Sequence, residues 1–278
     1  MSRSTLNDVV AALETLYDPA WAESWDAVGL VCGDPDQPVR RVLFAVDPTW
    51  AVVREAREWE ADLVVTHHPL YLKGTTSVAA STPKGRVIHT LIRSGIALYT
   101  AHTNADNANP GVSDALARAV GLDGELTPLA PSPYGESLGI GRVGDLASPV
   151  TLARFAERAA AGLPATAAGL RVAGDPDREI RRVAVSGGAG DSLLGAARAS
   201  GADVFLTADL RHHPASEFVE AGGPALVDAA HWATEWPWLG DAAALLTSRL
   251  AQRGINVETH VSSRVTDAWT TTAQRGMK

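Results

Sequence analysis

Three short segments of this 278-residue sequence contain residue types that bind divalent metal ions. They are VVTHHP (64–69), LYTAHTNAD (98–106) and VDAAHWATE (227–235). Each begins in a short apolar run and continues into histidine, aspartate or glutamate. Imidazole and carboxylate ligands without a thiolate favour zinc, manganese, iron, cobalt or nickel over calcium or magnesium. The three segments therefore predict a metal site, provided that the fold brings them together.

The spacing within the segments favours two ions over one. Successive side chains of a strand point to opposite faces, so His67 and His68 could not bind one ion if the strand continued regularly. The proline that follows requires a turn, where two adjacent imidazoles can serve two neighbouring ions. His231 and Glu235 are four residues apart, on one face if a helix has begun. The expected ligands of the two ions are His67, His68, Asp106, His231 and Glu235.

Each of these residues also has a simpler structural interpretation. The pair His67 and His68 can belong to an ordinary loop at the end of a strand. Asp106 lies in NADNANPG, which is rich in turn-forming residues. Glu235 can be a carboxylate in the first turn of a helix, where the helix dipole favours negative charge. Only the conjunction of all three segments favours metal binding.

The remaining histidines carry weaker signals. His89 lies inside a helical pattern and His260 near the end of the last predicted strand, so we expect both to be hydrogen-bonded structural residues. His212 and His213 lie in ADLRHHP (208–214). These two can add to the site or only begin a helix.

The predicted elements around the segments alternate between strand and helix. Apolar periodicity predicts a helix that Thr5 caps, and further helices over 49–60 and 83–95. Buried strands are predicted over the apolar runs 41–46, 62–66 and 96–100. This alternation is typical of an α/β fold with mostly parallel sheets flanked by helices. The carboxyl ends of such strands meet at one edge, where ligands bind.

An internal duplication accounts for the length of the chain. Residues 40–68 align without a gap with residues 181–209, at an offset of 141 positions, and eight of the 29 pairs are identical. The match predicts two similar α/β lobes. The proline-rich stretch LTPLAPSPYGE (126–136) is expected to connect them. The expected lobes are residues 1–125 with 226–278, which bind the metal, and residues 126–225.

Composition limits the functional classes. The net charge of −8 disfavours binding to nucleic acid, and no apolar stretch approaches the ~20 residues that span a bilayer. The single cysteine, Cys32, is expected to be a packed side chain in a reducing compartment. With no signal peptide at its start, the chain is expected in the cytoplasm. Its last eight or so residues are expected to be mobile.

The motifs together resemble a family of dinuclear metal-centre proteins, the GTP cyclohydrolase 1 type 2 homologues, which are bacterial relatives of the NIF-three-like proteins. The matching stretches run over nearly the whole chain and include WDAVGLVCG (25–33), THHPL (66–70), AHTNAD (101–106), TADLRHH (207–213) and HWATEWP (231–237). By this resemblance the five expected ligands fall on the metal-ligand positions of the family. His102 then sits in or beside the ligand shell.

The resemblance also implies properties that the residue pattern does not show. These are two duplicated α/β lobes and a homohexameric ring whose metal sites face an internal cavity. The chain lacks the domain that longer members insert between the lobes, so it resembles a short form.

Three functions are consistent with the sequence. The first is a metal-dependent hydrolase that opens the purine ring of GTP, with Glu235 or His102 moving protons. The second is a dinuclear phosphoesterase acting on a nucleotide. The third is a metal-binding scaffold or regulatory ring without catalytic activity.

Overall fold

The fold is that of a computed structural model, which describes residues 4–273. It divides into two compact units, Met1–Ala108 with Leu239–Thr266, and Asn109–Trp238 with Asp267–Lys278. Of the last eight residues, which the sequence predicts to be mobile, 274–278 lie outside the described residues, and that prediction stays untested. Among residues 4–273, no helix is both long and apolar enough to cross a bilayer.

The first unit is built on a five-stranded sheet with the order β1-β4-β3-β2-β11. β2, β3, β4 and β11 run parallel, and only β1, at one edge, is antiparallel to its neighbour. Its strands are β1 (Gly29–Cys32), β2 (Arg41–Ala45), β3 (Leu63–Thr66), β4 (Ala97–Thr100) and β11 (Glu258–Val261). Its helices are α1 (Leu6–Leu16), the 3-10 helix η1 (Pro19–Trp21), α2 (Trp50–Glu58), α3 (Pro83–Ser94), α4 (Thr103–Asn107) and the later part of α9 (His231–Ala251).

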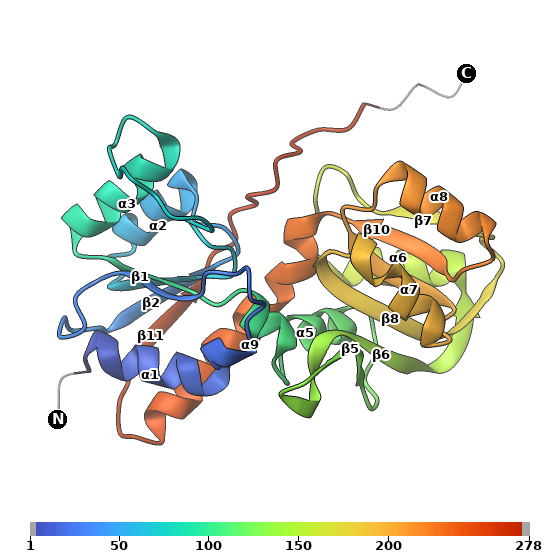
Figure 1. The fold of residues 1–278 in the computed structure, drawn as a ribbon, viewed down its shortest axis with the longest axis horizontal. Coiled ribbons are helices and arrows are strands. Elements are labelled where there is room, and N and C mark those ends of the chain that lie inside the picture. The colour runs from blue at the N-terminus through green and yellow to red at the C-terminus, as the bar shows by residue number, and fades with distance from the viewer. Residues whose placement is uncertain (1–3, 274–278) are drawn as a thin grey trace. The chain divides into compact units, whose positions relative to one another are not determined.

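Helices cover both faces of this sheet (Figure 1). α2 and α3 bury apolar residues against one face, and among the contacts are Val53, Leu91 and the strand residue Val64. α1 lies on the other face (Figure 1), and its Leu6 and Leu13 are fully buried. The alternation of strand side chains supplies apolar residues to both layers, which is why these strands read as continuous apolar runs.

The predicted caps begin the helices of the first unit where the sequence placed them. Thr5 and Asp8 form a capping box at α1, with Thr5 Oγ1 accepting from the Asp8 amide at 3.3 Å. In α3, Thr82 caps the first turn and Pro83 occupies its first position. α3 ends at Gly95, whose φ of 66° is left-handed and favours glycine. These features fix the start of each helix relative to the strand that precedes or follows it.

The second unit is built on a six-stranded sheet with the order β5-β6-β8-β9-β10-β7. β8, β9 and β10 are parallel in the centre, and the flanking strands pair antiparallel. Its strands are β5 (Thr127–Ser132), β6 (Gly135–Thr151), β7 (Arg171–Ala173), β8 (Glu179–Ala189), β9 (Val204–Ala208) and β10 (Ala225–Ala229). Its helices are α5 (Val112–Ala119), α6 (Leu152–Gly162), the 3-10 helix η2 (Asp191–Leu193), α7 (Leu194–Ala199), α8 (His212–Glu220) and the start of α9.

Two apolar clusters fill the layers of the second unit. One joins α5 and α6 to the sheet, with Phe155 fully buried in it. The other joins α7 and α8 to the opposite set of strand side chains and includes Phe205 and Phe218. Both units therefore have helices on each face of a sheet with parallel central strands, which confirms the predicted α/β class.

The duplication is visible in hydrogen bonds as well as in topology. In the first unit, Asp62 Oδ2 accepts from the amides of Arg40 and Arg41 at 2.7 and 3.0 Å. In the second, Asp203 Oδ2 accepts from the amides of Arg181 and Arg182 at 2.9 and 2.8 Å. These residues are 141 positions apart, the offset of the sequence match. The β2-α2-β3 segment therefore has a counterpart in the β8-α7-β9 segment.

The proline-rich stretch at 126–136 corrects one sequence expectation. It is not a connection between lobes, because it forms the edge strand β5 and the turn into β6. An edge strand tolerates proline, since one side of its backbone needs no partner. Gly139 lies opposite Pro131, and a Cβ there would lie 2.3 Å from the Ala130 carbonyl oxygen. The close pairing of β5 and β6 thus depends on that glycine.

The unit boundaries also differ from the expected residues 1–125 with 226–278 and 126–225. α5 packs into the apolar cluster of the second unit, and β10 pairs with β9 and β7 in its sheet. Both elements therefore belong to the second unit. One boundary, between Trp238 and Leu239, falls inside α9, where no change of composition marks it.

Candidate metal centre

Three parallel strands of the first unit end side by side at one edge of the sheet. Ala45 of β2 is in register with Thr66 of β3, and Thr66 is in register with Thr100 of β4. Two residues beyond these aligned positions come Asp47, His68 and His102. The register thus gathers polar side chains from three separate segments, as the sequence predicted for strand ends.

Three histidines of the first unit, His67, His68 and His102, form a compact cluster. The ring centroid of His67 lies 5.1 Å from those of both His68 and His102, and His68 and His102 are 5.6 Å apart. One ring nitrogen of each lies within 4.8 Å of those of the others. His67 is 1% exposed, and the other two rings are partly buried. An adjacent pair from one strand end and a third imidazole from the next therefore face a common region.

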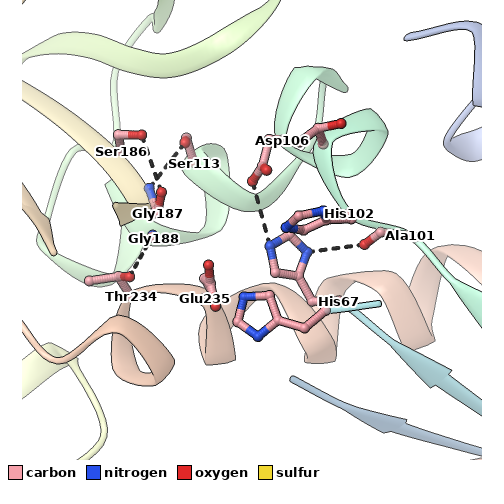
Figure 2. A network of polar contacts seen from close by, with 12 residues as sticks. His67, Ala101, His102, Asp106, Ser113, Ser186, Gly187, Gly188, Thr234 and Glu235 are labelled. Carbon is pink, nitrogen blue, oxygen red and sulfur yellow. Dashed lines mark hydrogen bonds and ion pairs between the residues drawn. The ribbon is translucent and has the colours of Figure 1, made fainter. Parts of the chain in front are cut away.

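Each of these imidazoles is held at Nδ1 by an oxygen atom. His67 Nδ1 lies 3.0 Å from the Ala101 carbonyl oxygen (Figure 2), and that oxygen can only accept a hydrogen bond. His68 Nδ1 lies 2.7 Å from Asp47 Oδ1 and His102 Nδ1 2.9 Å from Asp26 Oδ1. With the proton on Nδ1, the lone pair of the ring is on Nε2, the atom that would bind a metal ion.

The carboxyl group of Asp26 stays ionised. Burial opposes its charge, but hydrogen bonds from His102 and Thr103 outweigh burial and hold the pKa of Asp26 well below its usual range. The Thr103 amide donates to Asp26 Oδ2 at 3.0 Å. An ionised carboxylate only accepts hydrogen bonds, so Asp26 keeps the His102 proton on Nδ1.

Asp106 adds a carboxylate to the first unit. It lies on α4, and its Oδ1 is 3.8 Å from His67 Nε2 (Figure 2). The sequence suggested that His102, Asn104 and Asp106 share one side of an extended segment, but residues 103–107 are helical. Asn104 Oδ1 accepts from the His102 amide at 2.9 Å, and this bond fixes the turn before α4. Asp106 therefore approaches His67 from a helix rather than from a strand.

His231 and Glu235 form the corresponding group of the second unit. They are four residues apart in α9, and His231 Nε2 lies 2.9 Å from Glu235 Oε1. His231 Nδ1 lies 2.7 Å from Asp209 Oδ2, so this histidine too is held at Nδ1 by an oxygen. Glu235 is only 2% exposed, and a carboxylate that deeply buried must be balanced by a proton or a cation.

Glycines of β8 leave room for the Glu235 carboxylate. A Cβ at Gly188 would lie 2.7 Å from Glu235 Oε1 and 3.2 Å from His231 Nε2. The Gly188 amide donates to Thr234 Oγ1 at 2.9 Å (Figure 2), which ties the start of α9 to the strand. Thr234 therefore anchors this helix from within its first turn instead of capping it. A side chain at Gly188 would fill the space beside both functional groups.

The chemistry of these donors fits a divalent ion. Two ligands that each lie ~2.1 Å from one ion are ~3.0 to 3.4 Å apart. The separations from His67 Nε2 to Asp106 Oδ1 and from His231 Nε2 to Glu235 Oε1 are 3.8 and 2.9 Å, close to that range on either side. All five expected ligands lie in these two groups, and His102 lies with His67 and His68. Each unit thus contains imidazole and carboxylate groups with the composition of a metal site.

The sequence did not identify the residues that orient the histidines. Asp26, Asp47 and Asp209 were not among the candidates, although each occupies a recognisable place. Asp209 directly follows β9, Asp47 lies two residues beyond the end of β2, and Asp26 lies in the WDAVG stretch. A search for carboxylates at strand ends, beside the histidines, would have found two of the three.

The other histidines are now placed. His212 and His213 begin α8 and are exposed, their rings 5.1 Å apart, in agreement with the structural alternative. His260 Nε2 lies 3.0 Å from Glu55 Oε1, consistent with the expected structural role. His89 is exposed on α3, so the expectation of a hydrogen-bonded core residue is wrong there. Its position on the helix faces away from the apolar stripe.

Comparisons with known proteins extend over the whole chain. The sequence profile described as DUF34/NIF3 (NGG1p interacting factor 3) matches residues 4–268. A Streptomyces coelicolor protein named GTP cyclohydrolase 1 type 2 homolog is 58% identical over 267 residues, covering 95% of this chain and 93% of the relative. A Mycobacterium bovis protein with the same name is 38% identical over 371 residues, covering 95% of this chain and 96% of the relative. Its alignment is longer than this chain, so the mycobacterial relative contains segments that are missing here.

Solved structures show the same fold. A Bacillus cereus protein described as related to NIF3 has a TM-score of 0.91 and 26% identity, covering 98% of this chain and all of that one. A structure described as reduced HcgD from Methanocaldococcus jannaschii has a TM-score of 0.76 and 27% identity, covering 95% of this chain and 100% of that one.

Proposed function

The chain belongs to the DUF34/NIF3 family, and from this premise we propose that it is a metal-dependent hydrolase that acts on a nucleotide, in the manner of a GTP cyclohydrolase. Two divalent ions are its cofactors. Their ligands are His67, His68, Asp106, His231 and Glu235.

The observation that carries the proposal is a contact that four histidines share, an oxygen atom within hydrogen-bond distance of Nδ1. His67, His68, His102 and His231 each have Nδ1 within 3.0 Å of a carbonyl or carboxylate oxygen. An oxygen atom that accepts a hydrogen bond from Nδ1 fixes the tautomer of the ring and makes Nε2 a better metal ligand. Two of these rings also face a carboxylate through Nε2, His67 with Asp106 and His231 with Glu235, so the repeated arrangement favours metal binding.

Bound divalent ions supply Lewis acidity, which lowers the pKa of water and polarises a carbonyl or phosphoryl group. The protein residues supply orientation and proton transfer. Asp26 holds the His102 ring by Nδ1, so its Nε2 is positioned to take or give a proton. Glu235 is buried with its Oε1 2.9 Å from His231 Nε2, which places its carboxyl group to move a proton there.

The nature of the ions follows from the donor set. Nitrogen and oxygen ligands favour zinc, manganese, iron, cobalt or nickel. Burial raises the pKa of the Cys32 thiol to about 11, which disfavours the thiolate that a metal would need. Cys32 packs beside the apolar cluster of α2 and α3 and serves as a packed side chain.

The family resemblance extends the proposal to the assembly and the location. We propose a homohexamer in the cytoplasm, without a nucleic-acid or membrane partner. Light scattering of the purified protein tests the assembly, and cell fractionation tests the location.

Metal content and turnover test the function together. Protein purified without chelator is expected to contain two transition-metal ions per chain. With manganese or zinc bound, it is expected to consume GTP, followed by chromatography. His67→Ala and Glu235→Ala should lose metal and turnover, whereas His89→Ala, a change at an exposed histidine, should retain both.

The alternative functions give different results. Hydrolysis of phosphoesters without opening of the purine ring would indicate a phosphoesterase. Absence of turnover on every nucleotide, with disassembly on removal of metal, would indicate a scaffold. Wild-type protein that binds no transition metal would overturn the proposal.

A further inference from the structure

The first unit has a pocket of about 610 Å³ between α2, α3 and the end of β3. We call it the α2–α3 pocket. Its lining includes Trp50, His68, Ser81, Lys84 and Arg86. Small-molecule sites in proteins commonly have volumes of ~300 to 1,000 Å³. The pocket is therefore large enough for a molecule of nucleotide size.

Two cations line the α2–α3 pocket without an acidic partner. Lys84 and Arg86 are exposed, and within residues 4–273 neither forms an ion pair. Their side chains instead lie over aromatic rings, with Lys84 Nζ 5.9 Å from the centre of the Tyr71 ring and Arg86 Cζ 5.8 Å from that of Trp50. In a chain with a net charge of −8, two adjacent unpaired cations favour an anionic ligand.

Trp50 adds a flat apolar surface to the same pocket. It begins α2, and the residue is 38% exposed. Aromatic side chains at such positions stack on planar rings, and a guanidinium group beside the ring strengthens the contact with anionic groups. The pocket thus combines a stacking surface with positive charge.

One wall of the α2–α3 pocket is His68, an expected metal ligand. Asp47, which holds the His68 ring, lines the same wall. A ligand bound in the pocket therefore lies beside the proposed metal site, within the same unit. This position suits a substrate better than a remote effector.

From these observations we propose that the α2–α3 pocket binds a planar heterocycle that carries a phosphate group. The ring stacks on Trp50, and Arg86 and Lys84 bind the phosphate. Arginine pairs with phosphate through two hydrogen bonds, which favours phosphate over a single-point anion. As a substrate site, the pocket rests on the proposed function; as a binding site, it stands on its own lining.

Isothermal titration tests the pocket with three probes: guanosine 5′-monophosphate, guanosine and inorganic phosphate. We expect Trp50→Ala to weaken the binding of the monophosphate and of guanosine about tenfold, since one stacked base is worth ~1 to 3 kcal/mol. Arg86→Gln should weaken the monophosphate and phosphate about tenfold and leave guanosine unchanged. Each variant thus affects the probes that contain its partner group.

Matched controls separate the pocket from general effects. Arg93→Gln removes another exposed cation of α3, and Trp269→Ala removes an indole that is 71% exposed and lies outside the pocket. Both should bind all three probes within twofold of the wild type. Circular dichroism of every variant checks that the fold is retained.

Two results would overturn the inference. One is wild-type protein that fails to bind the monophosphate at about 1 mM, the limit of weak specific binding. The other is binding that neither Trp50→Ala nor Arg86→Gln weakens, including binding that depends only on bound zinc. Metal uptake is measured separately on the same samples, so protein that binds the monophosphate but takes up no transition metal would retain the pocket and reject the proposed function.

Discussion

Asp47 offers a direct test of the argument that carboxylates orient the metal ligands. Its Oδ1 lies 2.7 Å from His68 Nδ1, and Thr266 Oγ1 donates to its other oxygen. Asp47→Asn keeps the shape and lets the amide oxygen accept from His68, but it removes the negative charge. Asp47→Ala removes both the charge and the hydrogen bond. The two variants therefore separate the charge from the contact.

The size of the effect follows from this geometry. An ion bound to His68 Nε2 would lie ~7 Å from the Asp47 carboxylate, adding the hydrogen bond, the width of the ring and a ~2.1 Å metal bond. At an effective dielectric constant of ~20, the attraction is ~2.4 kcal/mol per unit of charge. Loss of a second-shell partner commonly costs a factor of ~10 to 100 in metal affinity, or ~1.4 to 2.7 kcal/mol. Loss of the charge alone accounts for most of this range, so we expect about fiftyfold for Asp47→Asn and about a hundredfold for Asp47→Ala.

The assay is a zinc titration in competition with a chromophoric chelator, on protein first stripped of metal. Asp36→Asn and Asp36→Ala are matched controls, because Asp36 is exposed in a turn of the same unit. Thermal unfolding without metal should be similar for all variants. With zinc in excess, Asp47→Ala should gain ~2.7 kcal/mol less stability than the wild type does.

Two results would refute the reasoning. If Asp47→Ala binds zinc within twofold of the wild type, the carboxylate does not act through His68. If Asp36→Ala weakens zinc binding as much as Asp47→Ala does, the effect is a general loss of negative charge.

Three further predictions test the stability of the fold and the reactivity of Cys32. Asp114 Oδ2 lies 2.8 Å from Nη2 of the buried Arg142 and forms an ion pair with it, so Asp114→Ala should lower the free energy of unfolding by ~3 to 5 kcal/mol in urea. Adding Arg142→Met should restore part of the loss, and an effect of Asp114→Ala below ~1 kcal/mol would contradict the prediction. Thr5→Ala removes the side-chain cap of α1 and should cost ~1 kcal/mol in the same assay, whereas Thr5→Ser should cost much less. Burial raises the pKa of Cys32 from 9.0 to about 11, so alkylation at pH 8, followed by mass spectrometry, should be ~100-fold slower than for free cysteine and should speed up as the pH rises. The neutral thiol stabilises the fold below pH 9, and this contribution is lost as the pH rises toward about 11.

Local sequence signals predicted the elements around the site closely. The strand expected over 41–46 is β2 (Arg41–Ala45), and the helix expected over 83–95 is α3 (Pro83–Ser94). Helix caps, glycines that end helices and apolar periodicity depend on residues a few positions apart, so they can be recognised in a single sequence. The candidate ligands could be recognised for a similar reason, because each lies in a short segment that begins with an apolar run.

The parts that sequence reasoning missed depend on pairing between distant segments. Prolines at 128 and 131 indicated a loop, yet their stretch is an edge strand, because pairing with β6 outweighs the local preference of proline. The orienting carboxylates were missed for a related reason. Nothing local to Asp26 indicates that it accepts from His102, 76 residues away in the chain.

The duplicated strand ends carry different residue types in the two units. At the amino ends of the strands, Asp62 and Asp203 make the same backbone hydrogen bonds, because both copies need that turn to fold. At the carboxyl end of the matching strand, position 68 is histidine and its counterpart, position 209, is aspartate. His68 is an expected ligand, whereas Asp209 holds the His231 ring. The strand end that supplies an expected ligand in one copy thus supplies the orienting carboxylate in the other. This difference is expected if folding limits the residues at the amino ends of the repeated strands, whereas the chemistry of the site limits the residues at their carboxyl ends.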